Sequence, residues 1–286
     1  MSPSVLLDGP LGLEATHTIN GFVINDSTAY PMVRPSKITG LHDSADFTDT
    51  RDSTSDTIGE TPYPTISRGK TVTYNGDPTK AGGIIADDLM ILRAIATAWR
   101  QAVVTPRDTT LAIAPHPTFG GPTLTGYGRC SGLNIDDEVV LGEGRVHDEA
   151  RAFVFSFRMS DPRWYDLSNP VSGSAADGVS HTLTMPGNAP SEPNFAVVTA
   201  GGAVVLENIT LGLNLTFRSD LPAGTLDVVF ANKSAFIGSE DVRGYIDWGT
   251  SNWWNASAAE KHLLPGANVL KATGGAWDVS AYPTVY

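Results

Sequence analysis

Histidine, cysteine and carboxylate side chains could give this 286-residue chain acid–base, nucleophilic or metal-binding chemistry. No two of the six histidines stand at a spacing typical of a metal site, such as two histidines separated by three residues. These histidines are His17, His42, His116, His147, His181 and His262. The sequence therefore predicts no compact zinc site and no cofactor.

The densest titratable cluster is His147-Asp148-Glu149. Neighbouring residues on a strand point to opposite faces, so these three side chains converge only if the segment is a turn. We interpret the cluster as a solvated loop. A pair of catalytic carboxylates, as in a glycosidase, remains an alternative among the 31 acidic residues, because such a pair is defined by the distance between its carboxyl groups in space.

Cys130 lies in the glycine-rich segment 126–132, which approaches a dinucleotide-binding motif but has one residue too many and no helical pattern after it. We interpret this segment as a flexible turn. Cys130 follows Arg129 but has no identifiable histidine partner, so it is interpreted as a small residue rather than a nucleophile. The chain also lacks a nucleophile-elbow motif and a phosphate-binding loop. We name no catalytic residue and expect no enzyme.

Three tryptophans in the last quarter of the chain form a more informative group: Trp248, Trp253 and Trp254. If the adjacent Trp253 and Trp254 lie on a strand, only one of them can face a core. The other is then exposed or at an interface, where it would suit sugar stacking or protein contact equally well. Trp253 and Trp254 are therefore our candidate exposed aromatic surface.

The charge of the chain argues against nucleic acid as a ligand. The formal net charge is -12, and residues 1–167 hold 14 basic against 21 acidic residues, while the remainder holds 5 against 10. Neither half offers the basic surface that phosphate binding needs, so we expect no stable nucleic-acid binding. No apolar run approaches a membrane span, and the N-terminus lacks the pattern of a signal peptide, so we expect no membrane insertion.

The elements that must position these residues are mostly strands. The length favours two domains, and 29 glycines with 19 prolines favour frequent turns. Phe153, Phe155 and Phe157 alternate, which predicts a strand with three rings on one face. Asp161-Pro162 ends that strand, because proline cannot donate to a ladder. We place the domain boundary at 167/168.

The N-terminal half, residues 1–167, is predicted to be β-rich with one helix. Asn20-Gly21 is a hairpin signal that breaks the strand pattern of Thr16–Ile24. Apolar residues recur at three- and four-residue steps over about 84–103, which predicts an amphipathic helix packed on a sheet. Further segments are expected as strands or edge strands: Ser4–Leu7, 32–34, Ser67–Tyr74 ending in an Asn75-Gly76 turn, Thr109–Ala114, Leu133–Leu141 and Arg151–Met159.

Residues 42–60 are rich in aspartate and poor in apolar residues. Like-charge repulsion predicts a solvated loop or a long exposed hairpin. An alternative is an arm that reaches a neighbouring subunit. Its candidate contact residues are Asp43, Asp46, Phe47, Asp49, Arg51 and Asp52.

The C-terminal half, residues 168–286, shows short strand patterns separated by turn signals, which is typical of a sandwich or jelly roll. The predicted strands are Val179–Met185, Phe195–Val198, Ala203–Asn208, Leu211–Arg218, Thr225–Phe230, Gly244–Asp247 and Val269–Ala272.

The chain resembles the distal tail proteins, or minor tail proteins, of long non-contractile-tailed bacteriophages. The features that carry the resemblance are the aromatic strand ending in residues 160–165, the helix about sixty residues upstream, and the β-rich C-terminal half. That half shows Gly187-Asn188-Ala189-Pro190-Ser191-Glu192-Pro193 before a strand and Trp253-Trp254 shortly before Leu264-Pro265-Gly266-Ala267-Asn268.

This resemblance implies an N-terminal split-barrel-like domain that forms a homohexameric ring with its copies, and a C-terminal galectin-like β-sandwich. The ring would join the tail tube protein to the tail tip or baseplate proteins in the virion and leave a channel for DNA. A carbohydrate-binding sandwich that recognises host glycans is the alternative function. A sandwich-type glycoside hydrolase is a third.

Overall fold

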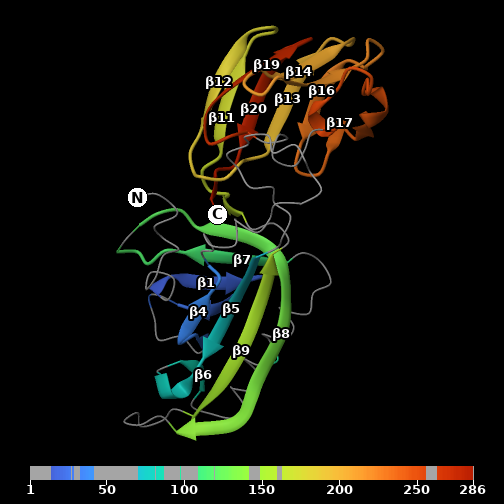
Figure 1. The fold of residues 1–286 in the computed structure, drawn as a ribbon. Coiled ribbons are helices and arrows are strands. Elements are labelled where there is room, and N and C mark those ends of the chain that lie inside the picture. Colours follow the sequence, from blue (N-terminus) through green and yellow to red (C-terminus); the bar gives the residue numbers. More distant parts are fainter. Residues whose placement is uncertain are drawn as a thin grey trace, which may run out of the picture. The chain divides into compact units, whose positions relative to one another are not determined.

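The computed structural model describes residues 14–26, 28, 33–41, 70–80, 82–86, 97, 109–118, 120–141, 149–159, 163–255 and 263–285. By their contacts these residues form two compact units, of which the first ends at Ser168 and the second spans Asn169–Val285. Both units consist mainly of antiparallel strands (Figure 1), so the predicted mainly-β class is confirmed.

The first unit is one curved sheet whose strands follow the order β2-β1-β7-β8-β9-β5-β4. Strand β6 pairs with β9 and β3, and β10 pairs with β8. The strands are β1 (Thr16–Ile19), β2 (Phe22–Asn25), β3 (Val33–Arg34), β4 (Lys37–Thr39), β5 (Lys70–Gly76), β6 (Gly83–Ala86), β7 (Thr109–Ala114), β8 (Leu124–Leu141), β9 (Glu149–Met159) and β10 (Trp164–Asp166).

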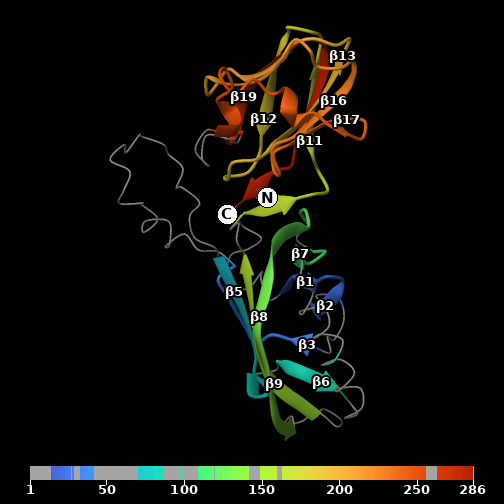
Figure 2. The same ribbon diagram turned by 90° about the vertical axis from the view of Figure 1, so that its right-hand side faces the viewer.

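Strands β8 and β9 form a long curved pair along the first unit (Figures 1 and 2). The register shifts between Ser131 and Asn134 and again between Ile135 and Val139, so β8 carries extra residues opposite β9. Bulges of this kind bend a strand and increase its twist. They explain how residues 128–141 of β8 lie against the shorter run of residues 149–159 in β9.

The predicted aromatic face of β9 is confirmed, since Phe153, Phe155 and Phe157 are all buried. Phe155 stacks on Tyr74 of β5, with ring centroids 5.4 Å apart. His17 Nδ1 of β1 lies at a hydrogen-bonding distance of 3.0 Å from the Tyr74 hydroxyl. Because β1 and β5 are not neighbours in the strand order, this contact requires the sheet to curl over its own face.

Of the two Asn-Gly turns predicted in the first unit, one is present and the other is not. Asn20 and Gly21 both have positive φ and join β1 to β2, so the predicted hairpin is confirmed. The Asn75-Gly76 turn is wrong, because both residues continue β5 and pair with β9. A Cβ at Gly76 would lie 2.1 Å from the Phe153 ring, so this glycine makes room for an aromatic ring.

The flexible turn predicted for residues 126–132 is also wrong, because the whole segment lies within β8. A Cβ on Gly128 would lie 2.3 Å from the backbone oxygen of Arg158, and one on Gly126 would lie 2.6 Å from the Met159 side chain. These glycines allow close approach of β9 rather than a reversal of the chain.

The predicted start of the helix over 84–103 is wrong, because Ile84–Ala86 belong to strand β6 and pair with β9. Of its other positions the structure describes Thr97 alone, so the rest of the helix stays a prediction. The apolar residues at the start of the segment fit both the helical period of 3.6 residues and the strand period of two. Pairing with β9 determined that they form a strand. Other predictions lie outside the described residues: Ser4–Leu7, segment 42–60, His147-Asp148 and Asp161-Pro162.

The second unit is a two-layer sandwich. One sheet has the order β11-β20-β13-β16-β17-β18 and the other β12-β19-β14-β15. Its strands are β11 (Val171–Ala175), β12 (Ser180–Met185), β13 (Pro193–Thr199), β14 (Val204–Asn208), β15 (Leu213–Phe217), β16 (Gly224–Val229), β17 (Ser234–Ile237), β18 (Glu240–Asp241), β19 (Gly266–Thr273) and β20 (Ala276–Ala281). The short strand β21 (Thr284–Val285) belongs to the same unit but to neither of these two sheets. One cluster of buried apolar residues from both sheets fills the space between them.

Most predicted strands of this unit are confirmed, but Gly244–Asp247 is not a strand. Residues Arg243–Tyr245 form a 3₁₀ turn (η4), followed by a single bridge between Ile246 and Phe217. The sequence prediction missed β11, β17, β18, β20 and β21. Of these, β17 and β18 are short, and β11 lacks large apolar residues, which weakens the period-2 signal.

We predict that Phe155→Ala lowers the free energy of unfolding of the first unit by about 3–5 kcal/mol, because it removes a fully buried ring from the contact with Tyr74. The neighbouring Val154 is 43% exposed, so Val154→Ala is the matched control and should cost less than about 1 kcal/mol. Urea denaturation, with hydrogen exchange of β5 and β9 amides as the local readout, measures both. Equal losses in the two variants would contradict the assignment of the core face.

Candidate functional site

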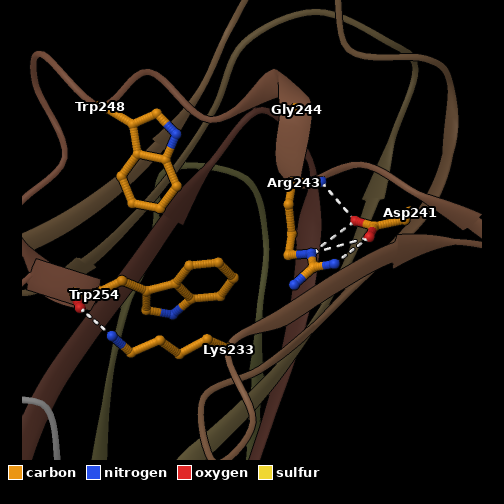
Figure 3. Close-up of a pocket in the computed structure, with 6 residues that line it drawn as sticks. All are labelled: Lys233, Asp241, Arg243, Gly244, Trp248 and Trp254. Carbon is orange, nitrogen blue, oxygen red and sulfur yellow. Dashed lines mark hydrogen bonds and ion pairs between the residues drawn. The ribbon is translucent and has the colours of Figure 1, made fainter.

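An open hollow of about 560 Å³ on the second unit brings aromatic and charged side chains together (Figure 3). The residues come from the turn before β17, from β18, from η4 and from two following turns. They are Lys233, Asp241, Arg243, Gly244, Trp248 and Trp254. A volume in this range is typical of small-molecule sites.

Trp248 presents its ring to solvent from a turn held by its neighbour Asp247. The Asp247 carboxylate accepts hydrogen bonds from the Gly249 amide at 3.0 Å and the Thr250 hydroxyl at 2.9 Å. The Asp247 amide in turn donates to the Thr216 carbonyl at 2.9 Å, which ties the turn to β15. Trp248 is 52% exposed even though its backbone is fixed in this way. The backbone that carries the exposed ring is therefore held in place.

Arg243 and Asp241 form an ion pair across the hollow from Trp248. The guanidinium donates from Nε at 3.0 Å and from Nη2 at 2.6 Å to the carboxylate, and the Arg243 amide donates to the same group at 3.0 Å. These hydrogen bonds lower the pKa of Asp241 and raise that of Arg243. The two N–H groups of Nη1 have no partner among the described residues.

Trp254 and Lys233 form the floor of the hollow. The Trp254 ring lies 6.3 Å from that of Trp248, with an angle of 44° between the planes. Lys233 Nζ donates to the Trp254 carbonyl at 2.9 Å, and Figure 3 shows its stem along the edge of the indole that carries the nitrogen. That Nε1 donor is buried without a hydrogen bond.

Lys233 also has an unusual backbone conformation, with φ of 52°. Left-handed backbone costs a residue with a Cβ about 1–2 kcal/mol relative to right-handed backbone. Residues held this way gather at functional sites more often than elsewhere, so the conformation is a reason to consider the hollow functional.

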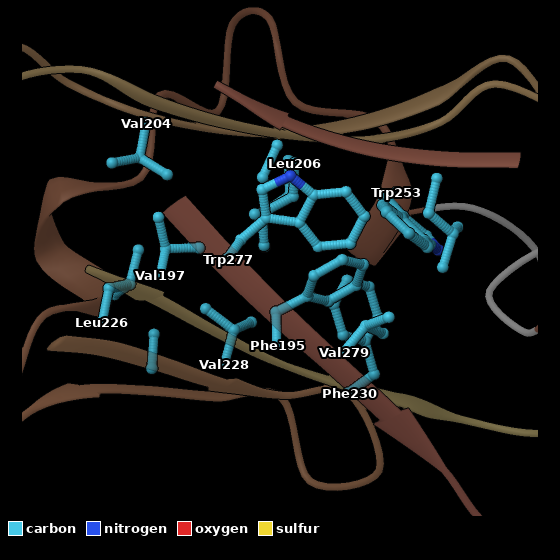
Figure 4. Packing of buried hydrophobic residues seen from close by; sticks show 14 of the residues in the cluster. Phe195, Val197, Val204, Leu206, Leu226, Val228, Phe230, Trp253, Trp277 and Val279 are labelled. Atoms are coloured by element: carbon cyan, nitrogen blue, oxygen red, sulfur yellow. The ribbon is translucent and has the colours of Figure 1, made fainter. Parts of the chain in front are cut away.

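The predicted exposed pair Trp253 and Trp254 is wrong, because these residues are 0% and 2% exposed. They lie on a 3₁₀ turn, Trp253–Asn255 (η5), rather than on a strand, so the alternation of faces does not apply. Figure 4 shows Trp253 within the core beside Phe230 and Phe195, with ring centroids 4.5 and 5.8 Å away. Among the described tryptophans, Trp248 is the exposed one.

The arm residues Asp43, Asp46, Phe47, Asp49, Arg51 and Asp52 lie outside the described residues, so their contact role stays a prediction. Within the described ranges, no group of three or more His, Cys, Asp or Glu side chains could hold a metal ion. Over those same ranges, no helix is long and apolar enough to cross a membrane.

Sequence reasoning missed Lys233, Asp241 and Arg243. The only local signal is the Asp-Val-Arg spacing, which is too common to single out. Their meeting with Trp248 depends on the pairing of β17 with β18 and on the bridge from Ile246 to Phe217. Chemically, the hollow offers aromatic faces and hydrogen-bond donors. Among the described residues of its lining, Asp241 is the one carboxylate, and it is paired with Arg243, so these residues suit binding better than hydrolysis by paired carboxylates.

A mainly antiparallel protein with one curled sheet and one sandwich is the class that these two units define. The solved structure of the Dit protein (gp 19.1) of phage SPP1 shares this fold, with a TM-score of 0.58 and 15% sequence identity. The likeness covers 94% of this chain and 98% of that chain. The SPP1 protein is described as a paradigm of the hub adsorption apparatus in phages that infect Gram-positive bacteria. The resemblance predicted from the sequence is thus confirmed at the level of the fold.

Two structures of the phage P2 baseplate in its activated conformation, with Ca and with Sr, are less similar. Their TM-scores are 0.41 and 0.39 at 6% and 5% identity, and the likeness covers 75% and 74% of this chain and 78% of each of those chains. These scores are too low to support an argument. No protein-family model matches the sequence, and no curated protein matches it.

We predict that the Asp241 carboxyl titrates below its usual pKa of 3.8 and that Arg243→Gln moves the titration back towards that value. A lowered pKa means that the ion pair persists above pH 3.8 and is lost as the pH falls through the lowered value. Carbon-detected NMR of the Asp241 carboxyl measures the midpoint. Arg218 forms a similar exposed pair with Asp220, so Arg218→Gln is the matched control and should leave Asp241 unchanged. Identical midpoints with and without Arg243 would refute the assignment.

Proposed function

We propose that this protein is a structural hub of a phage tail, a distal tail protein that forms a ring at the end of the tail tube. The observation that carries the proposal is the fold shared with the SPP1 hub protein over nearly the whole of both chains. A likeness that spans both units is more informative than one confined to a single sandwich, because β-sandwiches serve many functions. The residues of the sequence resemblance point the same way.

In this proposal the first unit is the split-barrel-like domain that closes a homohexameric ring, and the second is a galectin-like sandwich. Strands β2 and β4 support assembly, because they end the strand order and each pairs with one neighbour only among the described residues. Such edges are templates for pairing with another chain. The tail tube protein and the tail tip proteins are the proposed partners, and the virion tail is the proposed location.

The acidic character of the chain is compatible with a channel for DNA. A net charge of -12 in each copy disfavours retention of a polyanion that must pass through the ring. We propose no enzymatic activity, and the single, already paired carboxylate of the hollow agrees with a structural role. Glycan recognition by the second unit is the second candidate function, favoured by the exposed ring of Trp248.

In this proposal six copies close a ring through contacts that include their end strands, so we expect the purified protein to have the mass of six 30.3 kDa chains. Native mass spectrometry gives the stoichiometry, and negative-stain images show whether the particle has a central opening. Dilution at physiological salt tests whether the assembly is specific. A monomer at working concentration would count decisively against the ring.

We predict that removal of residues 43–59 leaves both units folded but weakens assembly, because the proposed arm contacts the next subunit. Light scattering measures the loss of mass, and circular dichroism checks the fold. Two further variants distinguish the length of the segment from the charge of its side chains. One replaces the segment with a Gly/Ser linker of equal length, and the other changes Asp43, Asp46, Asp49 and Asp52 to Asn. Normal rings from the deletion variant would show that the segment is only a solvated loop.

A further inference from the structure

The hollow on the second unit combines an exposed aromatic face with fixed hydrogen-bond donors. We propose that it binds a pyranose ring that carries an acidic substituent, with the sugar stacked on Trp248 and its carboxylate or phosphate held by Arg243. This inference does not rest on the tail-hub role, because it depends only on side chains within the second unit.

The exposed ring of Trp248 is the first part of the argument. Leaving half of an indole in water is unfavourable, and a core position would have buried it. The ring stays exposed on a turn fixed by Asp247, so a flat ligand would meet a preformed surface. The C–H face of a pyranose is apolar with a weakly positive edge, which matches the negative face of an aromatic ring.

The guanidinium of Arg243 is the second part. Asp241 fixes its orientation through Nε and Nη2, and Figure 3 shows the remaining nitrogen, Nη1, on the side away from Asp241. Guanidinium groups are well suited to carboxylate and phosphate because they donate in a fixed planar geometry. An acidic group within reach of Nη1 would therefore find donors already in place.

The local charge is the third part. Among the described residues of the lining, Lys233 and Arg243 face one carboxylate, Asp241, so these residues carry a net positive charge in a chain of net charge -12. An acidic ligand that the protein repels overall is attracted here. A neutral sugar would stack on Trp248 but would gain nothing from the positive charge of Lys233 and Arg243. A peptide would need a longer apolar groove than these lining residues provide.

Isothermal titration calorimetry of the full chain at physiological salt tests the proposal. The probes are tetragalacturonate, its neutral methyl ester, glucose 6-phosphate, glucose and inorganic phosphate. We expect at least one acidic sugar to bind about tenfold more tightly than its neutral counterpart, since one charge-assisted bidentate contact has this order of magnitude. Binding of tetragalacturonate indicates a carboxylate ligand, and binding of glucose 6-phosphate indicates a phosphate ligand.

Two variants locate the site. Trp248→Ala should weaken binding of the acidic sugar about tenfold or more without changing the thermal unfolding temperature, because the ring is exposed. Arg243→Gln should remove the preference for the acidic over the neutral sugar. Arg218→Gln, which alters a similar ion pair outside the hollow, should change neither.

Three results would overturn the proposal. Failure of every sugar to bind would do so, as would binding that Trp248→Ala leaves unchanged. Inorganic phosphate that binds as tightly as glucose 6-phosphate would indicate an adventitious ion only. None of these results bears on ring formation, which the particle mass decides separately.

Discussion

The buried contact of His17, Tyr74 and Phe155 is the constraint on which the first unit depends. It joins β1, β5 and β9, although β1 and β5 are separated in the strand order. An antiparallel sheet can leave one face in water, but a face with a histidine and a tyrosine hydroxyl must also satisfy their polar atoms. Here His17 Nδ1 and the Tyr74 hydroxyl lie 3.0 Å apart and form a hydrogen bond. Curling of the sheet therefore buries the aromatic rings and satisfies these polar atoms at the same time. The bulges of β8 allow the curvature that this contact requires.

In the second unit, stability and the candidate site share one aromatic cluster. Phe230 packs against both Trp253 and Trp254, and Trp254 in turn supports the exposed ring of Trp248. The floor of the hollow is therefore part of the core, whereas its rim consists of side chains fixed by short turns. This division suits recognition, because a rigid floor limits the conformational entropy that a ligand must remove on binding.

A structural hub and a sugar-binding surface are compatible roles for one chain. The first proposed role depends on strand edges and on surfaces that meet other copies, and the second depends on a compact group of side chains at the surface of the second unit. The fold shared with the SPP1 hub protein bears on the first role only. Function on such folds resides in individual sites, so the two roles require separate measurements.

The sequence by itself determined the mainly-β class and the aromatic face of β9, because alternation with a period of two is a local property of the chain. It also determined the Asn20-Gly21 hairpin, because that turn depends on two adjacent residues with positive φ. Only the tertiary structure decided that Gly76, Gly126 and Gly128 lie within strands. A glycine that admits a neighbouring strand looks the same in the sequence as one that makes a turn. The burial of both Trp253 and Trp254, and the meeting of Arg243 with Trp248, likewise depend on pairing between distant segments, which no local pattern encodes.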